Sequence, residues 1–574
     1  MEVTDYPDIL SPFELKRLVG THILFHNARL AEDLKKLPNS IVSEESFLQD
    51  FSFVMEEMAQ MWQLQIDNSH TKSVYAEHYG GDGIGRNGGG VRCANDGNVL
   101  LKGIGTNHLV GKDTKFSHAN GSLALLDAVT ETIYSEVLLE LLPVGTVRCL
   151  GILVTGADKA YCPFSSANAD DTTVGAILVR EKCFRPAHLM RSAFIPHIGL
   201  DQGNKFAEFN RLKRLFTSIQ PEFASQGGFV KVINQYLYKQ ADQFAFARIA
   251  RIFHGAVSSS NVAIDGKWLD LNTASFVEPG VNFAMSESST PLAEEHKFTL
   301  QIYNELAYTY AKNIGRPINF SEIKTKYIKH YKAQQRYHSP WVLGLSRKAT
   351  QSAADPEATE ILCSSFATLL ETGPDIVTPV RKRDRADESL KEYLAQIFLD
   401  AWEHLNKQRA DISNKTGTAL GQIIQAVYHG SKHDIKFDAF FNATFLTAFK
   451  RANHHPVFCR ARINDTLVPL IRSENYSAIS NVISTCITSA QWLFSSSENY
   501  VLCLFNGSGL TLNYQLKTDC YELSDSGSKQ QYCLSLRDAI CYIQTYRDKF
   551  YLLNYDFGLG LLASLQFLEE LHGE

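Results

Sequence analysis

The chain has 574 residues, of which 44% are hydrophobic, 21% charged and 11% aromatic. This balance is typical of a folded globular protein and excludes a disordered, collagen-like or membrane-embedded chain. At about 150 residues per domain, the length predicts three or four domain-sized units or fewer large ones. Lys and Arg number 56 against 62 Asp and Glu, a formal charge of −6, so no bulk positive field is expected to attract nucleic acid or anionic lipid.

Targeting and cysteine patterns favour a cytoplasmic protein. The acidic N-terminal segment has no basic region followed by a long apolar stretch, so no secretory signal is predicted. The longest apolar runs, such as residues 558–567, fall short of the ~20 residues that a membrane-spanning helix needs. The eleven cysteines are scattered and form no CxxC pair, which predicts reduced thiols rather than a disulfide framework or a zinc site.

The first elements in chain order are a glycine-rich region and a helix. Residues 78–121 are rich in Gly and Asn, and their apolar run 99–101 ends at Lys102, which predicts short strands joined by glycine turns. Residues 122–145 place Leu, Val and Ile near helical spacing, which predicts a helix. Asn120 or Ser122 is available to cap its first turn.

The remainder of the chain is mostly helical by pattern. Residues 147–154 and 173–181 predict two strands, and residues 206–250 predict helices. A second loop-rich block, residues 254–280, contains a short hairpin around Asp265-Gly266, and long amphipathic helices follow it. Residues 499–516 predict one further hairpin within an otherwise helical C-terminal third.

Four features follow one another in an order that carries chemical meaning. A glycine-rich loop comes first, then a lysine at the end of an apolar strand, then a helix with carboxylates, and much later Asn261 and Asp270. Phosphoryl and nucleotidyl transfer in kinase-like folds requires a flexible lid, a lysine held on the phosphates by a helix glutamate, and Asn and Asp ligands for a metal. Each feature alone is weak, but the joint order favours a nucleotide-dependent transferase.

The motifs that follow this order are spread over about the first half of the chain. They are HNARLAEDL (26–34), Tyr75 and His78, the glycines 88–90, LKGIGT (101–106), ANGS (119–122), ETIYSEV (131–137), GAILVR (175–180), PAHLMR (186–191), His254-Gly255, Asn261, Leu269-Asp270 and Glu278-Pro279-Gly280. Together they resemble the selenoprotein O (SelO) family of protein-kinase-like adenylyltransferases. Identity is low outside these blocks.

The resemblance implies a fold and an activity. The fold would be α+β and bilobal like a protein kinase, with an N-terminal lobe at residues 1–200, a C-terminal lobe at 201–345 and a mainly helical extension at 346–574. The activity would be Mg-ATP-dependent transfer of AMP, rather than of the γ-phosphate, to a protein or peptide acceptor, because ATP lies inverted in this family. The extension has no catalytic signature and could bind a partner protein.

The resemblance also assigns roles to individual residues. Lys102 would contact the nucleotide phosphates, with Glu131 as its partner, and the metal ligands for Mg²⁺ would be Asn261 and Asp270. The remaining assignments are nucleotide contacts from Gly88, Gly90, Asn120 and Gly121, and phosphate contacts from Arg180 and Arg191.

The lysine's partner is ambiguous from the sequence. The resemblance points to Glu131, but at 100° per residue this side chain lies opposite Val129 and Ile133, whereas Glu136 falls within the apolar stripe of the helix. A carboxylate on a buried face needs a partner, because burying it unpaired is very costly. We prefer Glu131, and expect the other carboxylate to be held by a backbone or arginine donor.

The chain departs from the family pattern at the position expected for the catalytic base. Immediately before Asn261 the family has an Asp that resembles the base for the acceptor hydroxyl, and here the residue is Ser260. Serine is no general base near neutral pH without a helper. The protein could therefore be an ATP-binding pseudokinase scaffold. Alternatively, it could adenylate a carboxylate, which needs no deprotonation, as in the activation of a peptide C-terminus during microcin-type peptide maturation.

Overall fold

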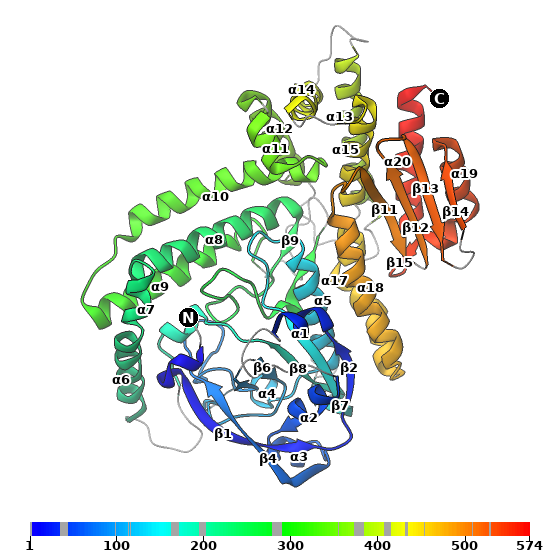
Figure 1. Cartoon of the computed structure of the whole chain (residues 1–574). Helices are drawn as coiled ribbons and strands as arrows, with labels where there is room; N and C mark the ends of the chain where they lie inside the picture. The colour runs from blue at the N-terminus through cyan, green and yellow to red at the C-terminus, as the bar shows by residue number, and fades with distance from the viewer. Residues whose placement is uncertain are drawn as a thin grey trace.

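The computed structural model describes residues 3–34, 44–97, 99–112, 114, 116–161, 172–194, 203–277, 290–353, 355–371, 384–406, 415–430, 434–452, 454–507, 509–526 and 530–573. The fold is α+β, with a large antiparallel sheet in the N-terminal part and a mainly helical C-terminal part (Figure 1). In the described chain no helix is long and apolar enough to cross a membrane.

Eight antiparallel strands form the N-terminal sheet in the order β2-β7-β8-β6-β5-β4-β1-β3. Their bounds are Leu10–Leu18 (β1), His22–His26 (β2), Phe53–Val54 (β3), Ile66–Glu77 (β4), Cys93–Asp96 (β5), Val99–Lys102 (β6), Cys149–Tyr161 (β7) and Thr172–Glu181 (β8). The two strands predicted at 147–154 and 173–181 are thereby confirmed as the paired strands β7 and β8.

Both faces of the sheet are buried at its central strands. Alternate residues of its central strands enter two different cores: Leu153 and Ile177 face one, and Ile152 and Leu178 face the other. Three helices cover the first face, α1 (Ala28–Leu34), α2 (Glu44–Phe51) and α3 (Glu56–Met61). The second face packs on α5 (Leu125–Leu139). Because side chains alternate along a strand, one strand can serve both cores.

Helix α5 is the predicted glutamate-bearing helix, but it differs from the prediction in two respects. Its N-cap is Ala124, with no side-chain cap. Asn120 instead accepts hydrogen bonds from the backbone and hydroxyl of Ser122, at 2.8 and 2.6 Å. The residues from Leu125 to Leu138 are almost all buried, so the helix has no solvent-facing side. It is enclosed by the sheet and by the C-terminal helices α17 (Arg460–Arg472) and α18 (Tyr476–Phe494).

The middle of the chain is helical, as the sequence predicts. It comprises α6 (Gly203–Ser218), α7 (Gln220–Ser225), α8 (Phe229–Ala250), α9 (His296–Ile314) and α10 (Phe320–Val342). Between α8 and α9, residues 251–277 form a loop-rich segment closed by the short antiparallel pair β9 (Ile252–Phe253) and β10 (Ser275–Phe276). Inside it, Val262 pairs with Trp268 around the predicted turn at Asp265-Gly266. Residues Glu278-Pro279-Gly280 lie outside the described residues.

The C-terminal part is less uniformly helical than predicted. Its helices are α11 (Arg347–Ala353), α12 (Pro356–Glu371), α13 (Asp384–Leu405), α14 (Lys415–Gly430), α15 (Phe437–Ala452), α16 (His454–Phe458), α17, α18, α19 (Leu536–Thr545) and α20 (Phe557–His572). The predicted hairpin is present as β11 (Val501–Gly507) and β12 (Leu510–Gln515), but β13 (Cys520–Asp525) and β14 (Gln530–Leu534) extend it to a four-stranded sheet. In β13, the buried Tyr521 and Leu523 alternate with Glu522 and Ser524, so the sequence carries a strand pattern there that was not predicted.

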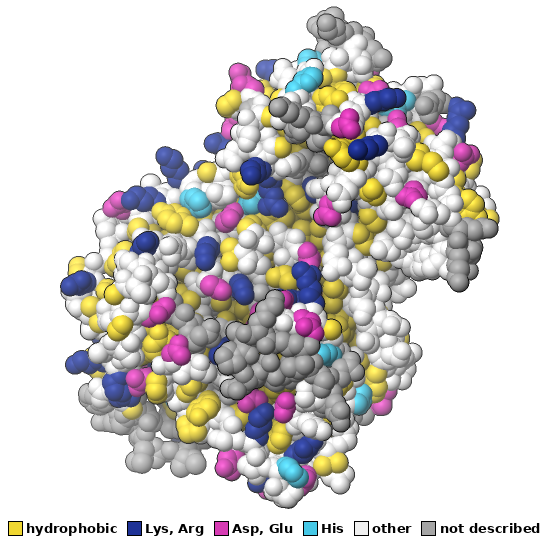
Figure 2. All heavy atoms as spheres, in the orientation of Figure 1, with side chains coloured by type: hydrophobic (Ala, Val, Ile, Leu, Met, Phe, Trp, Pro, Cys, Tyr) yellow, Lys and Arg dark blue, Asp and Glu magenta, His cyan; other side chains and the backbone are white. Residues whose placement is uncertain are grey.

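One hydrophobic core runs through all three parts of the chain. It includes Ile133 of α5, Phe276 of β10 and Phe494 of α18, and the Tyr134 hydroxyl donates to the Phe458 carbonyl oxygen at 2.7 Å. The C-terminal part therefore holds α5 in place directly. On the face shown in Figure 2, acidic and basic side chains are interspersed, as expected for a chain with a small net charge. The ten described cysteines are free thiols.

Candidate active site

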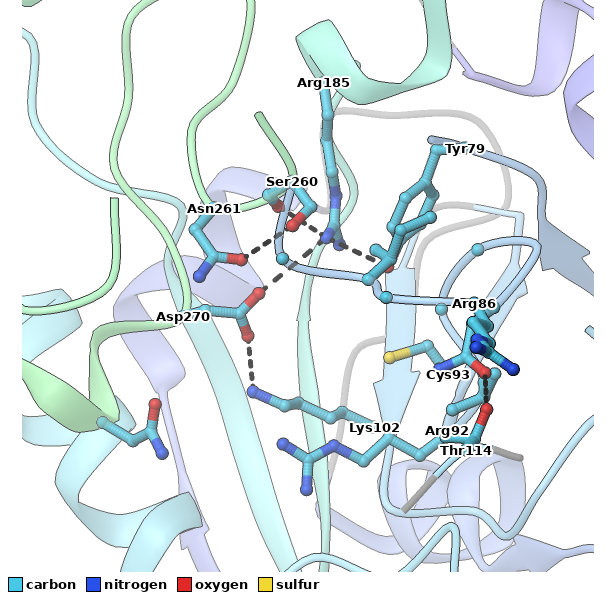
Figure 3. Close-up of a pocket in the computed structure, with 18 of the residues that line it drawn as sticks. Tyr79, Arg86, Arg92, Cys93, Lys102, Thr114, Arg185, Ser260, Asn261 and Asp270 are labelled. Atoms are coloured by element: carbon cyan, nitrogen blue, oxygen red, sulfur yellow. Dashed lines mark hydrogen bonds and ion pairs between the residues drawn. The ribbon is translucent and has the colours of Figure 1, made fainter. Parts of the chain in front are cut away.

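A cavity of about 580 Å³ brings together segments that are far apart in the sequence (Figure 3). The glycine-rich segment, β6, β8 and the loop between α8 and α9 all contribute to its wall. Its lining residues are Tyr79, Gly83, Ile84, Gly85, Arg86, Asn87, Gly89, Gly90, Val91, Arg92, Cys93, Lys102, Thr114, Arg180, Arg185, Ser260, Asn261, Asp270 and Asn272. Five of these side chains are cationic and one is acidic, so the cavity suits a polyanion.

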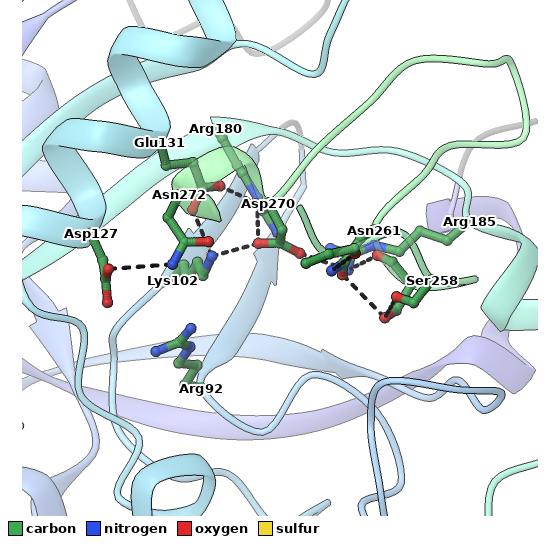
Figure 4. A network of polar contacts seen from close by, with 12 residues as sticks. Arg92, Lys102, Asp127, Glu131, Arg180, Arg185, Ser258, Asn261, Asp270 and Asn272 are labelled. Carbon is green, nitrogen blue, oxygen red and sulfur yellow. Dashed lines mark hydrogen bonds and ion pairs between the residues drawn. The ribbon is translucent and has the colours of Figure 1, made fainter. Parts of the chain in front are cut away.

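Four charged side chains form a closed network at one wall of this cavity (Figure 4). Lys102 Nζ lies 2.6 Å from Glu131 Oε2 and 2.5 Å from Asp270 Oδ1. Arg180 Nη1 lies 2.5 Å from Glu131 Oε1 and 2.9 Å from the same Asp270 oxygen. Each anion thus contacts both cations. Because the four come from β6, α5, β8 and the α8–α9 loop, the network ties the sheet to the middle of the chain.

The sheet register explains why Lys102 and Arg180 meet. Lys102 is opposite Leu178, and Arg180 is opposite Leu100, on adjacent antiparallel strands. The two cationic side chains are therefore diagonal neighbours on the face that packs against α5. Burial opposes the charge of Asp270, but Arg180, Lys102 and Arg185 together hold the pKa of its carboxyl well below the usual range. Asp270 is thus ionised at any pH near neutrality.

The structure distinguishes the two helix glutamates. Glu131 contacts Lys102, whereas Glu136 accepts two hydrogen bonds from Arg148, at 3.1 Å from Nε and 2.9 Å from Nη2. Glu136 is also buried, and this bidentate pair satisfies it. The lysine's partner is therefore the preferred one, and the other glutamate has the arginine donor expected of a structural carboxylate.

The Glu136–Arg148 pair gives a first prediction. Glu136→Gln removes the carboxylate that accepts both of these Arg148 hydrogen bonds, and leaves Asp33, at 3.4 Å, and the charge of Glu181. Removing one member of a buried pair costs about 3 kcal/mol, so we expect the free energy of unfolding in urea to fall by about that amount, with the dissociation constant for nucleotide unchanged. Glu140→Gln, in an exposed pair with Arg29, is the matched control, with a change below about 1 kcal/mol. Weaker nucleotide binding in Glu136→Gln would place Glu136 in the site.

Asn261 and Ser260 line the cavity beside Asp270. The Asn261 amide nitrogen donates to the Ala256 carbonyl at 2.8 Å, which turns its Oδ1 toward Ser260. Ser260 Oγ donates to that oxygen at 3.2 Å and lies 3.0 Å from Ser258 Oγ. Of these two residues, Asn261 thus presents an oxygen ligand and Ser260 a hydroxyl.

Two buried side chains hold this loop from behind. The His254 ring nitrogen Nε2 lies 3.1 Å from the Asn261 carbonyl oxygen, and Nδ1 accepts from the Ala256 N–H at 3.4 Å. This arrangement fixes the neutral ring with hydrogen on Nε2, and burial lowers the pKa of His254 to about 4. Glu295 accepts from the backbone N–H groups of His254 and Gly255 at 3.1 and 2.8 Å, and burial raises its pKa to about 7.

The glycine-rich segment lies against the serine turn at residues 258–260. A Cβ at Gly81 would come within 2.2 Å of Ser259 Oγ, and one at Gly89 within 1.9 Å of the Glu77 carbonyl oxygen. Both glycines have positive φ angles, +77° and +156°, so only glycine allows this close approach. Gly90 lines the cavity, whereas Gly88 is buried behind it, against Phe194 and Leu109.

A second arginine in the cavity wall was not among the residues singled out in the sequence. The resemblance assigned a phosphate contact to Arg191, but that residue is exposed and does not line the cavity. Arg185 does: its Nη1 donates to the Ser260 carbonyl at 2.8 Å, and its guanidinium lies 5.1 Å from the Tyr79 ring centre. The short helix at Pro186–Leu189 (η3) directs the chain so that Arg185 points inward. A cation before a proline is the only sequence signal for this.

Buried side chains fix Arg185 in this position. Its backbone N–H donates to His188 Nδ1 at 3.0 Å, and the other nitrogen of that ring lies 3.4 Å from Glu77 Oε2. The Asn95 amide donates to the second Glu77 oxygen at 2.7 Å. Although burial opposes it, the contacts with His188 and Arg185 lower the pKa of Glu77 to about 2. A fixed chain of polar groups therefore leads from the sheet to the cavity.

Asn120 and Gly121 support the cavity without lining it. A Cβ at Gly121 would come within 2.2 Å of Gly105 and Thr106 backbone atoms, so this turn packs tightly on the chain that follows Lys102. Arg92, a lining residue, donates to the Ser122 carbonyl at 3.2 Å. Asn120 and Gly121 thus make contacts within the turn, and their contacts with a nucleotide stay predictions. Arg86 and Arg92 are cations that line the cavity.

The side chains present fit a metal ion shared with phosphates. Among the described residues, no group of three or more His, Cys, Asp or Glu side chains could hold a metal alone. Asp270 and Asn261 nevertheless supply one carboxylate and one amide oxygen at the cavity wall. Mg²⁺ is commonly held by one or two carboxylates together with substrate phosphates and water, so this donor set suits Mg²⁺ when a polyphosphate is bound.

No protein-family model matches the chain, and no curated protein matches it significantly. The kinase-like assignment and the similarity to the SelO family therefore rest on the short motifs and on the site described above.

Proposed function

We propose that the chain binds Mg-ATP in this cavity and transfers AMP from it to a protein or peptide acceptor, within a kinase-like arrangement of two lobes. The observation that carries the proposal is the network in which Lys102 contacts both Glu131 and Asp270 beside a glycine-lined, cationic cavity. These are the groups, in the chain order, that phosphoryl and nucleotidyl transfer use. The choice of AMP over the γ-phosphate rests on the resemblance to the SelO family.

Unpartnered donors support binding of an anion. The Nε atoms of Arg180 and Arg185 are buried, yet neither has a hydrogen-bond partner in the described structure. Unsatisfied buried donors are costly, particularly on charged groups. Since both residues line the cavity, phosphate oxygens are suitable partners for guanidinium groups held in this way.

The roles of the residues follow from their positions. Lys102 and Arg180 would neutralise charge on the phosphates as pyrophosphate leaves, and Glu131 would keep both cations in place. Asp270 and Asn261 would hold Mg²⁺, which supplies charge neutralisation and orients the polyphosphate. In the transfer, a bond forms between the acceptor oxygen and the α-phosphorus, and the bond from the α-phosphorus to the bridging oxygen of pyrophosphate breaks.

Mass analysis of the products made from Mg-ATP tests the proposal. We expect pyrophosphate and an acceptor heavier by one AMP, whereas ADP and a phosphorylated acceptor would contradict nucleotidyl transfer. Lys102→Met should lower the rate by about 10²-fold or more. Binding of Mg-ATP without any turnover would instead support the ATP-binding pseudokinase scaffold.

A further inference from the structure

The described wall of the cavity offers an acceptor hydroxyl no free carboxylate or imidazole. Among its described lining residues, Asp270 is the only carboxylate, and no histidine is present. One Asp270 oxygen contacts both Lys102 Nζ, at 2.5 Å, and Arg180 Nη1, at 2.9 Å, and the other lies 3.8 Å from Arg185 Nη1. Because cations already hold both of its oxygens, Asp270 is poorly placed to accept a proton from an acceptor hydroxyl.

The histidine behind Asn261 is also unsuitable. His254 is fully buried behind Asn261 and does not line the cavity. Both of its ring nitrogens are engaged, one with the Asn261 carbonyl and the other with the Ala256 N–H. No proton could pass from an acceptor in the cavity to this ring without breaking the loop that presents Asn261.

The donor at the wall around Ser260 is Arg185, because the Ser260 hydroxyl already donates to Asn261. Ser258 and Ser260 hydroxyls share a hydrogen bond of 3.0 Å, and the backbone carbonyl of Ser260, which could otherwise accept, is taken by Arg185 at 2.8 Å. The Arg185 side chain is 98% buried, lies against the Tyr79 ring and keeps an unpartnered Nε. Such a guanidinium, fixed next to hydroxyls, matches the geometry and charge of a carboxylate.

We infer that the group accepting AMP is a carboxylate, bound beside Ser260 and oriented by Arg185. The inference rests on the proposed function. A carboxylate is ionised at neutral pH, so its oxygen attacks the α-phosphorus of ATP with no proton removed. The carboxylate oxygen–phosphorus bond forms as the bond to pyrophosphate breaks, giving an acyl adenylate and pyrophosphate. A following acyl-transfer reaction, with an amine, thiol or alcohol as nucleophile, must consume this mixed anhydride and release AMP.

Two pools of short random peptides test the acceptor class with the full-length protein. One pool has free C-termini and includes Asp and Glu; the other is C-terminally amidated and lacks Asp and Glu, but keeps Ser, Thr and Tyr. We expect exchange of labelled pyrophosphate into Mg-ATP with the first pool and its loss with the second. Hydroxylamine added to the first reaction should yield peptide hydroxamates and AMP.

Ser260→Asp is the diagnostic variant. It places a carboxylate next to Asn261, where a general base typically contributes at least about 10²-fold. We expect it to gain hydroxylamine-stable labelling of the second pool and to lose exchange with the first, because its charge repels a carboxylate acceptor. Asp82→Asn is the matched control. Asp82 is exposed on the glycine-rich segment and does not line the cavity, and this variant tests whether a carboxylate on that segment acts as the base. Its exchange rate should equal that of the unaltered protein.

The outcomes separate this inference from the proposed function. Hydroxylamine-stable AMP on the second pool with the unaltered protein would overturn the carboxylate acceptor and leave AMP transfer standing. Mg-ATP binding with no exchange in either pool would also overturn it. Absence of Mg-ATP binding, measured separately by calorimetry, would instead defeat the proposed function itself.

Discussion

Asp270→Asn should separate nucleotide binding from turnover. We expect the rate of AMP transfer to fall on the order of 10³-fold, because the variant loses the only carboxylate that the described cavity wall offers to Mg²⁺. Binding of ATP without Mg²⁺ should be retained or strengthened. The reason is electrostatic: the carboxylate that partly neutralises Lys102, Arg180 and Arg185 is gone, while the phosphate charge is unchanged.

The backbone at this position makes asparagine the right replacement. Asp270 has φ +57° and ψ +49°, in the left-handed region, immediately before the short helix Leu271–Thr273 (η4). Apart from glycine, Asn and Asp occupy this region most readily. Asparagine therefore preserves the turn, whereas alanine would add backbone strain to the loss of charge.

Asp265→Asn is the matched control for this variant. Asp265 is exposed in the neighbouring turn, and its Oδ1 accepts from the Lys267 N–H at 3.2 Å. The measurements are isothermal titration with ATP, with and without Mg²⁺, and the initial rate of pyrophosphate release. Turnover by Asp270→Asn within about tenfold of the unaltered protein would be incompatible with Asp270 as a metal ligand.

Helix α5 shows which features the sequence can predict and which it cannot. The spacing of Leu, Val and Ile predicted the helix, and the glycine-rich residues before it predicted the strands and turns that precede it. The assumption that it has one buried face was wrong, because α17 and α18 cover the side that the sheet leaves open. Helical periodicity alone therefore could not assign Glu131 and Glu136. The deciding contacts, with Lys102 and Arg148, come from strands distant in the sequence.

The candidate site was predictable where the side chains sit at the ends of regular elements. Lys102 ends β6, and local pattern predicted a lysine at the end of an apolar strand. Asn261 and Asp270, which flank a glycine-containing turn, were singled out through the resemblance to family motifs. Arg185 was missed because its position depends on buried contacts with His188 and Tyr79 that have no sequence period. Arg191, which the resemblance singled out, is exposed and does not line the cavity, since a short motif says nothing about which of two nearby arginines points inward.

The C-terminal part also gains a role that its sequence does not reveal. Tyr134, one helical turn from Glu131, donates to Phe458, and Phe276 stacks between Tyr134 and Phe494 at ring distances of 6.3 and 6.2 Å. These contacts join α5 and the Asp270 loop segment to the C-terminal helices. Because cores are closely packed, a change in the C-terminal part would be transmitted to the glutamate that holds Lys102.

Acidification should destabilise the protein strongly before its carboxylates titrate. Burial lowers the pKa of His78, His254 and His296 from 6.5 to about 4. Each group binds fewer protons in the folded than in the unfolded state between these values, so each contributes stability that is present above pH 6.5 and lost toward pH 4. Glu295 acts in the opposite sense: its pKa is raised from 4.5 to about 7, so its contribution falls as pH rises. Since three histidines act against one glutamate, we expect the free energy of unfolding to fall on acidification by on the order of 5 kcal/mol.

His296→Phe isolates one of these groups. The His296 ring is stacked on Tyr327 and Tyr331, at 5.8 and 4.1 Å between ring centres, and its buried Nδ1 has no hydrogen-bond partner. Phenylalanine can keep the stacking but cannot titrate. We therefore expect urea unfolding at pH 7 to change little, and the loss of stability between pH 7 and pH 4 to shrink by about 3 kcal/mol. His429→Gln, at an exposed position, should leave the loss as it is. An unaltered pH dependence in His296→Phe would mean that the loss between pH 7 and pH 4 begins elsewhere. The next groups to test are then His78 and His254, whose contributions are lost over the same pH range.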